Sequence, residues 1–134
     1  VPGAWCDLGS GGGSPAIPLR LSLQSGELTM IESRARKCAF LREAIRVLRL
    51  PRTHVLASRF ESVEGVSGVD LVSVRAVRLD QNFLNFACSL LQPQGFLLLF
   101  GEVVSDRRFV EVSSDSLPDG SQVTLLRMDV PRGT

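Results

Sequence analysis

A run of small residues, Gly9-Ser10-Gly11-Gly12-Gly13-Ser14, is the first part of the chain that could bind a ligand. It directly follows residues 4–8, a short apolar run typical of a parallel strand buried on both faces. Glycines at this point allow positive φ angles and a close approach between the backbone and a ligand. A helix that starts after the loop would add unpaired N–H groups. The pattern predicts a ligand-binding turn, and a tight β-α turn without a ligand is the alternative.

Glu32 is a second candidate, because it stands at the end of another apolar run, residues 28–31. A carboxylate can accept two hydrogen bonds from a diol, such as the hydroxyls of a ribose. Glu32 is therefore expected to bind the ribose of a nucleotide-like ligand, whichever class of ligand the glycine loop takes. An ordinary acidic residue near the start of a helix is the alternative.

The other reactive side chains exclude several kinds of site. His54 is the only histidine, and Cys6, Cys38 and Cys88 include no Cys-x-x-Cys pair. A multi-histidine metal centre is excluded, and a zinc site, a disulfide framework or a Ser-His-Asp triad is not indicated. We expect three reduced thiols and no bound metal.

Strand-like and helix-like segments alternate along the first hundred residues. We expect strands at residues 4–8, 28–31, 54–58, 69–74 and 96–100, and helices at residues 15–23, 34–50 and 80–91. Ser14 and Ser33 are the expected N-caps, Pro51 ends the second helix, and Pro93-Gln94-Gly95 forms the turn before the fifth strand. This alternation predicts a mostly parallel sheet with right-handed crossovers and helices on both faces.

The second predicted helix is strongly basic. From residue 34 to residue 52 there are seven basic residues and one acid, which gives +6 for this stretch and −5 for the rest of the chain. Leu41, Ile45 and Leu48 recur with helical spacing and should face the core. The basic residues expected to bind phosphates are Arg34, Arg36, Lys37, Arg42 and Arg46. A solvated basic face is the alternative.

The pattern changes after residue 101. Residues 109–113 and 123–128 are both strand-like and are joined through Pro118-Asp119-Gly120, which predicts an antiparallel pair. Such a pair is typical of the class I methyltransferase sheet, which binds S-adenosylmethionine, and not of the all-parallel dinucleotide half-fold. Ser14 also occupies the third glycine position of a Gly-x-Gly-x-x-Gly motif. An NAD-dependent oxidoreductase is therefore the less favoured alternative.

Four segments of the sequence occur in the order found in one family of enzymes. They are residues 7–19, residues 28–43, Ser58-Arg59-Phe60-Glu61 and Ser73-Val74-Arg75-Ala76. Together they resemble the RsmG (GidB) family, bacterial enzymes that methylate N7 of a guanine in 16S ribosomal RNA. The resemblance extends over about residues 1–101 and implies a class I, Rossmann-like methyltransferase domain.

The resemblance also implies roles for individual residues. The cofactor-binding residues would be Asp7, Gly9, Ser10, Gly11 and Gly13 at the methionine moiety, Glu32 and Ser33 at the ribose, and Arg59, Phe60 and Glu61 at the adenine. Arg75 would reach the target nucleotide or its phosphate, and the basic helix would bind RNA. Guanine N7 carries an unprotonated lone pair, so positioning can supply the catalysis and no general base is needed.

The chain departs from this family in three ways. Ser14 stands where many members have Phe, Phe100 stands where Lys is usual, and the family's N-terminal helical segment is not found before Val1. We expect a single domain over residues 1–134, truncated at its N-terminus, monomeric, cytoplasmic and without a membrane span. A fragment that binds cofactor or RNA without turnover is the alternative.

Overall fold

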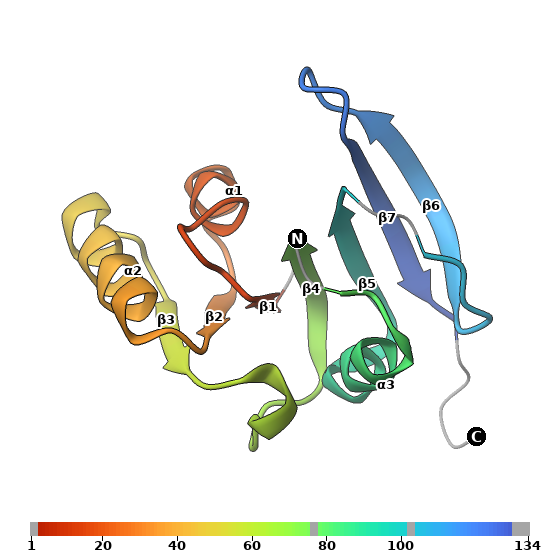
Figure 1. The fold of residues 1–134 in the computed structure, drawn as a ribbon, viewed down its shortest axis with the longest axis horizontal. Helices are drawn as coiled ribbons and strands as arrows, with labels where there is room; N and C mark the ends of the chain where they lie inside the picture. Colours follow the sequence, from red (N-terminus) through yellow and green to blue (C-terminus); the bar gives the residue numbers. More distant parts are fainter. Residues whose placement is uncertain (1–2, 76–77, 102–103, 130–134) are drawn as a thin grey trace.

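Seven strands form one sheet in the computed structural model, which describes residues 3–75, 78–101 and 104–129 (Figure 1). The strands are β1 (Ala4–Leu8), β2 (Glu27–Glu32), β3 (Thr53–Ala57), β4 (Val69–Arg75), β5 (Leu91–Phe100), β6 (Phe109–Ser116) and β7 (Gln122–Met128). Their order across the sheet is β3-β2-β1-β4-β5-β7-β6. Strands β1 to β5 pair in parallel, whereas β7 runs antiparallel to both β5 and β6. The predicted mixed sheet with its closing antiparallel pair is confirmed.

Helices cover both faces of this sheet. They are α1 (Ala16–Ser22), α2 (Ala35–Leu48) and α3 (Gln81–Leu90), with a short 3-10 helix, η1 (Phe60–Ser62). The chain moves outward in one direction from β1 to β3 and in the other direction from β4 to β5. Because crossovers between parallel strands are right-handed, α1 and α2 lie on one face and α3 on the other, as Figure 1 shows.

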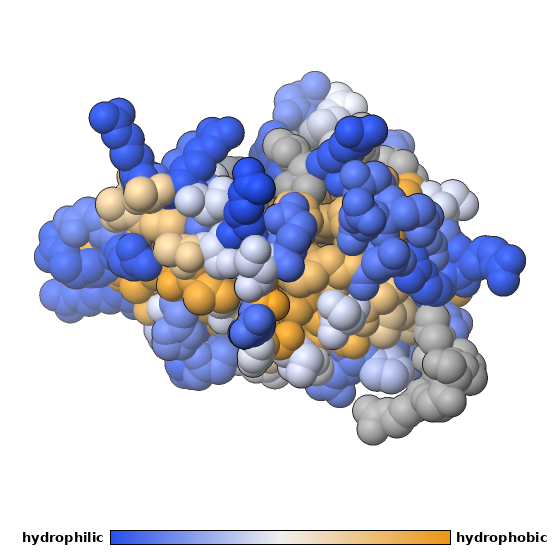
Figure 2. All heavy atoms as spheres, turned by 60° about the horizontal axis from the view of Figure 1, so that its bottom comes forward, coloured by the Kyte–Doolittle hydropathy of each residue, from blue (hydrophilic) through white to orange (hydrophobic). Residues whose placement is uncertain are grey.

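Successive residues of β1 point to opposite faces and enter two separate apolar clusters. Trp5 packs with Ala16 of α1 and Leu41 of α2. Cys6 and Leu8 belong to the cluster that contains the buried face of α3. Figure 2, which shows the side that carries η1 and α3, has hydrophobic residues gathered in its middle and hydrophilic residues around them. Strand β1 is therefore held by apolar packing on both faces, and the glycine loop begins directly at its end.

The predicted serine caps of α1 and α2 are wrong. Pro15 is the N-cap of α1 and Arg34 is the N-cap of α2, and neither helix has a side-chain cap bond. At α2 the Glu32 carboxylate accepts the Arg34 N–H at 2.8 Å. The Glu32 side chain therefore binds the backbone at the start of α2, where the Ser33 hydroxyl makes no cap bond.

The core-facing stripe of α2 also differs from the prediction. Leu41 is buried and Ile45 half-buried as expected, but Leu48 is 44% exposed, and Cys38 is buried in the preceding turn. The helix ends at Leu48, and Arg49 takes a left-handed conformation with φ 52°. This reversal directs the chain back to the sheet, so Leu50 is buried instead of Leu48.

Strand β5 is longer than predicted, because it begins at Leu91 and includes Pro93-Gln94-Gly95, which were predicted to form a turn before it. Val69 of β4 pairs with Leu91, and Leu71 then pairs with Phe96. The residues between Leu91 and Phe96 form an irregularity inside the strand, in which Gln94 has φ 71°. The turn-forming residues therefore form an irregularity within β5 instead of a turn between α3 and β5.

The antiparallel pair β6 and β7 is connected to α3 by a hydrogen bond from Arg108, which also forms a local ion pair. Arg108, just before β6, binds Asp106 at 3.0 Å and donates to the Asn85 side chain of α3 at 2.9 Å. This ion pair holds the pKa of Asp106 at about 2, well below its usual range. The predicted turn at residues 118–120 is present, with the Gly120 N–H donating to the Leu117 carbonyl.

Candidate functional site

A pocket of about 660 Å³ lies at the carboxyl ends of β1, β2 and β4. Ligands of open α/β sheets bind at this edge, near the point where the strand order reverses. The pocket is lined by Gly9, Ser10, Gly11, Gly12, Ser14, Ile31, Glu32, Ser33, Arg34, Lys37, Ser58, Arg59, Phe60, Glu61 and Arg75. Most of these residues are predicted site residues, although Arg34 and Lys37 are predicted to bind RNA and not the cofactor.

The glycine loop makes its sharp turn by adopting left-handed backbone conformations. Gly9, Gly11 and Gly13 have φ angles of 67°, 55° and 92°, which side chains other than glycine rarely allow. The Gly9 and Ser10 N–H groups both donate to the Ile31 carbonyl, at 2.8 and 3.2 Å. The loop is thereby held against the end of β2 while Gly11 and Gly12 face the pocket.

Two glycines of the loop have different structural surroundings. A Cβ at Gly13 would overlap the Ile17 side chain of α1, whereas a Cβ at Gly12 would meet nothing within 4 Å. In the dinucleotide motif the third glycine, here Ser14, is the residue that packs closely against the helix. In this chain Gly13 does so, and Ser14 is exposed. Gly13 serves the packing of α1, and Gly12 leaves open space in the pocket.

Glu32 connects three parts of the site. Its two carboxylate oxygens accept the Gly11 N–H and the Arg34 N–H, each at 2.8 Å, and the residue is 6% exposed. Its carbonyl accepts the Ser58 N–H at 3.0 Å, at the end of β3. Each carboxylate oxygen can accept a second hydrogen bond. Glu32 can therefore hold the loop and bind a diol at the same time.

Asp7 lies beneath the loop and does not line the pocket. The Ser73 hydroxyl donates to Asp7 Oδ1 and in turn accepts the Trp5 ring N–H at 2.8 Å. Asp7 is 1% exposed, and its Oδ2 has no hydrogen-bond partner among the described residues. Burial raises the pKa of Asp7 to about 6, although hydrogen bonds from Ser73 and Ser10 act in the opposite direction. Asp7 therefore lies beneath the loop and outside the pocket lining, with one buried carboxylate oxygen left without a hydrogen bond.

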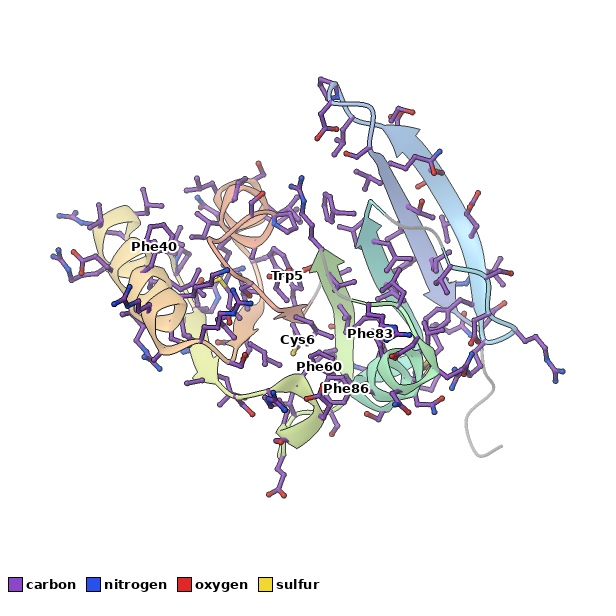
Figure 3. The ribbon with its side chains drawn as sticks, viewed as in Figure 1. Trp5, Cys6, Phe40, Phe60, Phe83 and Phe86 are labelled. Atoms are coloured by element: carbon purple, nitrogen blue, oxygen red, sulfur yellow. The ribbon has the colours of Figure 1, made fainter. Side chains whose placement is uncertain are left out.

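The segment after β3 contributes one partly buried ring and two exposed charges. The Phe60 ring lies 6.0 Å from the Phe83 ring and 5.5 Å from the Phe86 ring, measured between centroids. Figure 3 shows these three rings together beside α3. Phe60 is thus both part of the α3 cluster and part of the pocket wall, while Arg59 and Glu61 are exposed around it.

The pocket is rich in positive charge. Arg34, Lys37, Arg59 and Arg75 line it, together with two acids, Glu32 and Glu61. Arg75 lies at the end of β4, and its guanidinium donates to the Ser14 hydroxyl at 3.3 Å. Ala76, the last residue of the motif that contains Arg75, is outside the described residues. A ligand in this pocket would therefore lie among four cations and two acids.

The remaining predicted RNA contacts lie on the outside of α2. Arg36, Arg42 and Arg46 are exposed, and Arg46 forms an ion pair with Glu43 one turn earlier in the helix. These three side chains do not line the pocket. The structure thus divides the basic helix into a pocket end, with Arg34 and Lys37, and an outer surface.

Three other observations concern the described residues only. They contain no group of three or more His, Cys, Asp or Glu side chains placed to hold a metal ion. Their helices are too short or too polar to span a membrane. The three cysteines are free, with Cys6 and Cys38 buried, and burial raises the pKa of Cys6 to about 12.

Comparison with known proteins identifies the family. The GidB family, described as rRNA small subunit methyltransferase G, matches residues 2–111 of the chain. The chain belongs to the GidB family. Ribosomal RNA small subunit methyltransferase G of Paracoccus denitrificans is 42% identical over 93 residues, which cover 69% of this chain and 48% of the relative. The same enzyme of Stenotrophomonas maltophilia is 34% identical over 121 residues, 90% of this chain and 55% of the relative.

The fold of this GidB chain is that of a class I methyltransferase. A solved SAM-dependent methyltransferase from Aquifex aeolicus superimposes with a TM-score of 0.75 at 14% sequence identity, covering 95% of this chain and 82% of that one. The predicted fold class and the resemblance to the family are confirmed. The chain spans about half the length of the curated GidB relatives it matches.

Phe100, which departs from the family's usual lysine, lies close to the pocket in this GidB chain. It pairs with Arg75 across β4 and β5 and with Val123 across β5 and β7, and it is half-buried. A lysine here would place a second cation beside Arg75. Relative to the lysine that the resemblance implies, Phe100 removes one charge beside Arg75 at the end of β5 and leaves the glycine loop and Glu32 unchanged.

Proposed function

We propose that this chain binds S-adenosylmethionine and takes part in methyl transfer to N7 of a guanine in small-subunit ribosomal RNA. The observation that carries the proposal is the arrangement of Glu32, whose buried carboxylate accepts the Gly11 and Arg34 N–H groups at the edge of the pocket. It places a diol acceptor one loop away from a backbone that can approach a ligand closely. Membership of the GidB family supports the same function.

The pocket residues then have distinct roles in binding the cofactor. The loop from Gly9 to Gly13 contacts the methionine moiety, with Asp7 below it. Glu32 accepts the ribose hydroxyls, and Ser33 lies next to it in the pocket wall. Arg59, Phe60 and Glu61 surround the adenine, which would lie against the exposed part of the Phe60 ring.

The residues present are sufficient for this chemistry. When bound, S-adenosylmethionine supplies an electrophilic methyl group on a sulfonium centre. The N7 lone pair of guanine can attack without losing a proton, so the chain needs to orient the base and exclude water. Arg75 at the end of β4 can hold the target nucleotide through its phosphate. A chain with one histidine, exposed on β3 and bonded to Glu27, can therefore serve this reaction.

Calorimetric titration with S-adenosylhomocysteine and with NAD tests the cofactor. We expect micromolar binding of S-adenosylhomocysteine, no binding of NAD, and about ten-fold weaker binding by Glu32→Gln, which loses a charged acceptor. Glu64→Gln is the matched control, because Glu64 is exposed in the following loop and outside the pocket. Binding of NAD alone would contradict the proposal.

Incubation with labelled S-adenosylmethionine and small ribosomal subunits that lack the modification tests the transfer. We expect label at guanine N7 in wild type and a large loss in Arg75→Ala. Cofactor binding without any transfer would instead support the alternative, a chain that binds cofactor or RNA without turnover.

A further inference from the structure

A strip of apolar side chains is exposed on the outer surface of α2. Phe40 is 54% exposed, Val47 is 60% exposed and Leu48 is 44% exposed. Phe40 and Val47 are seven residues apart, so they lie on the same side of the helix two turns apart, and Leu48 directly follows Val47. None of the three takes part in the packing of α2 on the sheet, for which Cys38, Leu41 and Ile45 are used.

Phe40 is the member of this strip closest to the pocket. Arg36 and Lys37 precede it by four and three residues, so all three side chains lie on neighbouring positions of the helix surface. Lys37 lines the pocket, and its Nζ would be 3.8 Å from a Cβ added at Gly11. Phe40 therefore lies about one helical turn along α2 from Lys37, which lines the pocket, and next to two cations.

Phe40 also differs from the other phenylalanines in its surroundings. Phe83 is buried, and Phe60 and Phe86 pack with it beside α3. Figure 3 shows Phe40 on α2, far from that group. Exposing an aromatic ring leaves apolar surface in water, which folding alone does not favour. The ring is available to a partner.

We propose that Phe40 is a stacking surface for an unpaired base of the RNA substrate, with Arg36 and Lys37 on the neighbouring phosphates. The inference rests on the proposed function and extends it to a residue outside the pocket. Stacking of a base on an aromatic side chain is worth about 1–3 kcal/mol, and basic residues beside the ring follow the backbone. RNA that is read in this way presents bases in loops and single strands.

Charge favours RNA over an apolar protein partner at this strip. The stretch from residue 34 to residue 52 carries seven basic residues and one acid. A partner that covered Phe40 with apolar surface would also cover Arg36 and Lys37, and removing cations from water without anions costs free energy. An RNA strand offers an anion beside each base and leaves no such charge unmatched.

The test compares RNA binding by wild type, Phe40→Leu and Phe40→Trp, with Val47→Ala as the control on the same strip. The probe is a short fluorescein-labelled single-stranded RNA, and a matched RNA with abasic positions measures the contribution of the bases. We expect Phe40→Leu, which keeps apolar volume and loses the ring, to bind at least about five-fold more weakly. Phe40→Trp should bind as tightly as wild type or more tightly, and Val47→Ala should bind as wild type does.

Two further measurements keep the outcomes distinct. Binding of S-adenosylhomocysteine should be the same in wild type and in all three variants. If wild type does not bind S-adenosylhomocysteine, the proposed function is overturned, and this result does not decide the role of Phe40. Equal RNA affinity of wild type and Phe40→Leu, or equal affinity for normal and abasic RNA, would overturn the inference. So would dimerisation of the wild type that Val47→Asp abolishes while RNA binding persists, since the strip would then be a protein interface.

Discussion

Asp7 is a single residue whose ionisation opposes folding. Burial raises its pKa from about 3.8 to about 6. Between these values the folded chain keeps a proton that the unfolded chain has released, so stability falls as the pH rises through this range. At pH 3 and below both states are mostly protonated, and above about pH 7 the full penalty is present.

We expect Asp7→Asn to remove this dependence. The amide keeps the shape of the side chain without a charge, so the stability of the variant relative to wild type should rise by about 2 to 3 kcal/mol between pH 3 and pH 7. Urea unfolding at a series of pH values measures the difference. A parallel pH dependence of wild type and variant would show that the carboxylate has another source of stabilisation.

Substitutions at Gly12 and Gly13 should affect ligand binding and folding separately. Gly12→Ala adds a methyl group to open space in the pocket, so thermal stability should be unchanged while S-adenosylhomocysteine binds more weakly. Gly13→Ala adds a methyl group where Ile17 lies and forces a positive φ on alanine, so it should destabilise the fold by about 1–3 kcal/mol. Thermal unfolding and calorimetry report the two effects separately. Unchanged cofactor affinity in Gly12→Ala would mean that the ligand does not approach this part of the loop.

At the scale of elements, Arg20 joins α1 to the start of β3. The side chain is fully buried, and its guanidinium donates to main-chain carbonyls of Leu23, Ser25, Gly26, Pro51 and Arg52, as well as to the Thr53 hydroxyl. These carbonyls belong to the two connections that lead into β2 and β3. The guanidinium therefore satisfies the backbone of loops that no helix or strand would satisfy.

Arg20→Met should lower the free energy of unfolding by about 3 kcal/mol or more, because it leaves several buried carbonyls without donors. Arg20→Lys should recover part of the loss, since an ammonium donates fewer bonds in a less extended geometry. Arg36→Met is the control on an exposed arginine and should change stability by less than about 0.5 kcal/mol. Denaturant unfolding gives all three values, and a small effect of Arg20→Met would imply that water replaces the guanidinium.

The sequence predicts elements well where the pattern is local. Strand β1 has the expected bounds, and the antiparallel pair follows from two strand-like runs around a Pro-Asp-Gly turn. The predicted cap of α2 is wrong because Glu32 reaches the start of the helix from the preceding strand. No local pattern indicates that Arg20 is buried, because its hydrogen-bond partners extend to Thr53, 33 residues later in the sequence.

The candidate site follows the same rule. The glycine loop and Glu32 could be named from the pattern because they stand at the ends of strands whose carboxyl ends meet the same edge of the sheet. The segment from Arg59 to Glu61 could be named only from the resemblance to the family. The pocket positions of Arg34 and Lys37 depend on the side of α2 that turns toward the loop, and a charge count cannot determine it. That Gly13, and not Ser14, packs against α1 depends on the conformation of the loop.

At the scale of the whole molecule, charge is divided between two regions. The stretch that contains α2 carries +6 and the remainder of the chain −5. A chain with a total of +1 can thus attract RNA to one side. If about four phosphates are contacted, affinity for single-stranded RNA should fall roughly fifty-fold between 50 and 200 mM salt.

Fluorescence anisotropy over this salt range measures the effect. S-adenosylhomocysteine binding provides the control, because it should depend only weakly on salt. A flat salt response of RNA binding would contradict a role for the basic side of the molecule.

The two hydrogen bonds of the Glu32 carboxylate have a consequence for the energetics of binding. They tie Gly11 and the start of α2 to the sheet as part of the folded chain itself. Restricting the backbone costs about 1–2 kcal/mol of conformational entropy for each residue. For the glycine loop this cost falls on folding, so a ligand meets a preorganised surface and its affinity depends on fit instead of on loop closure.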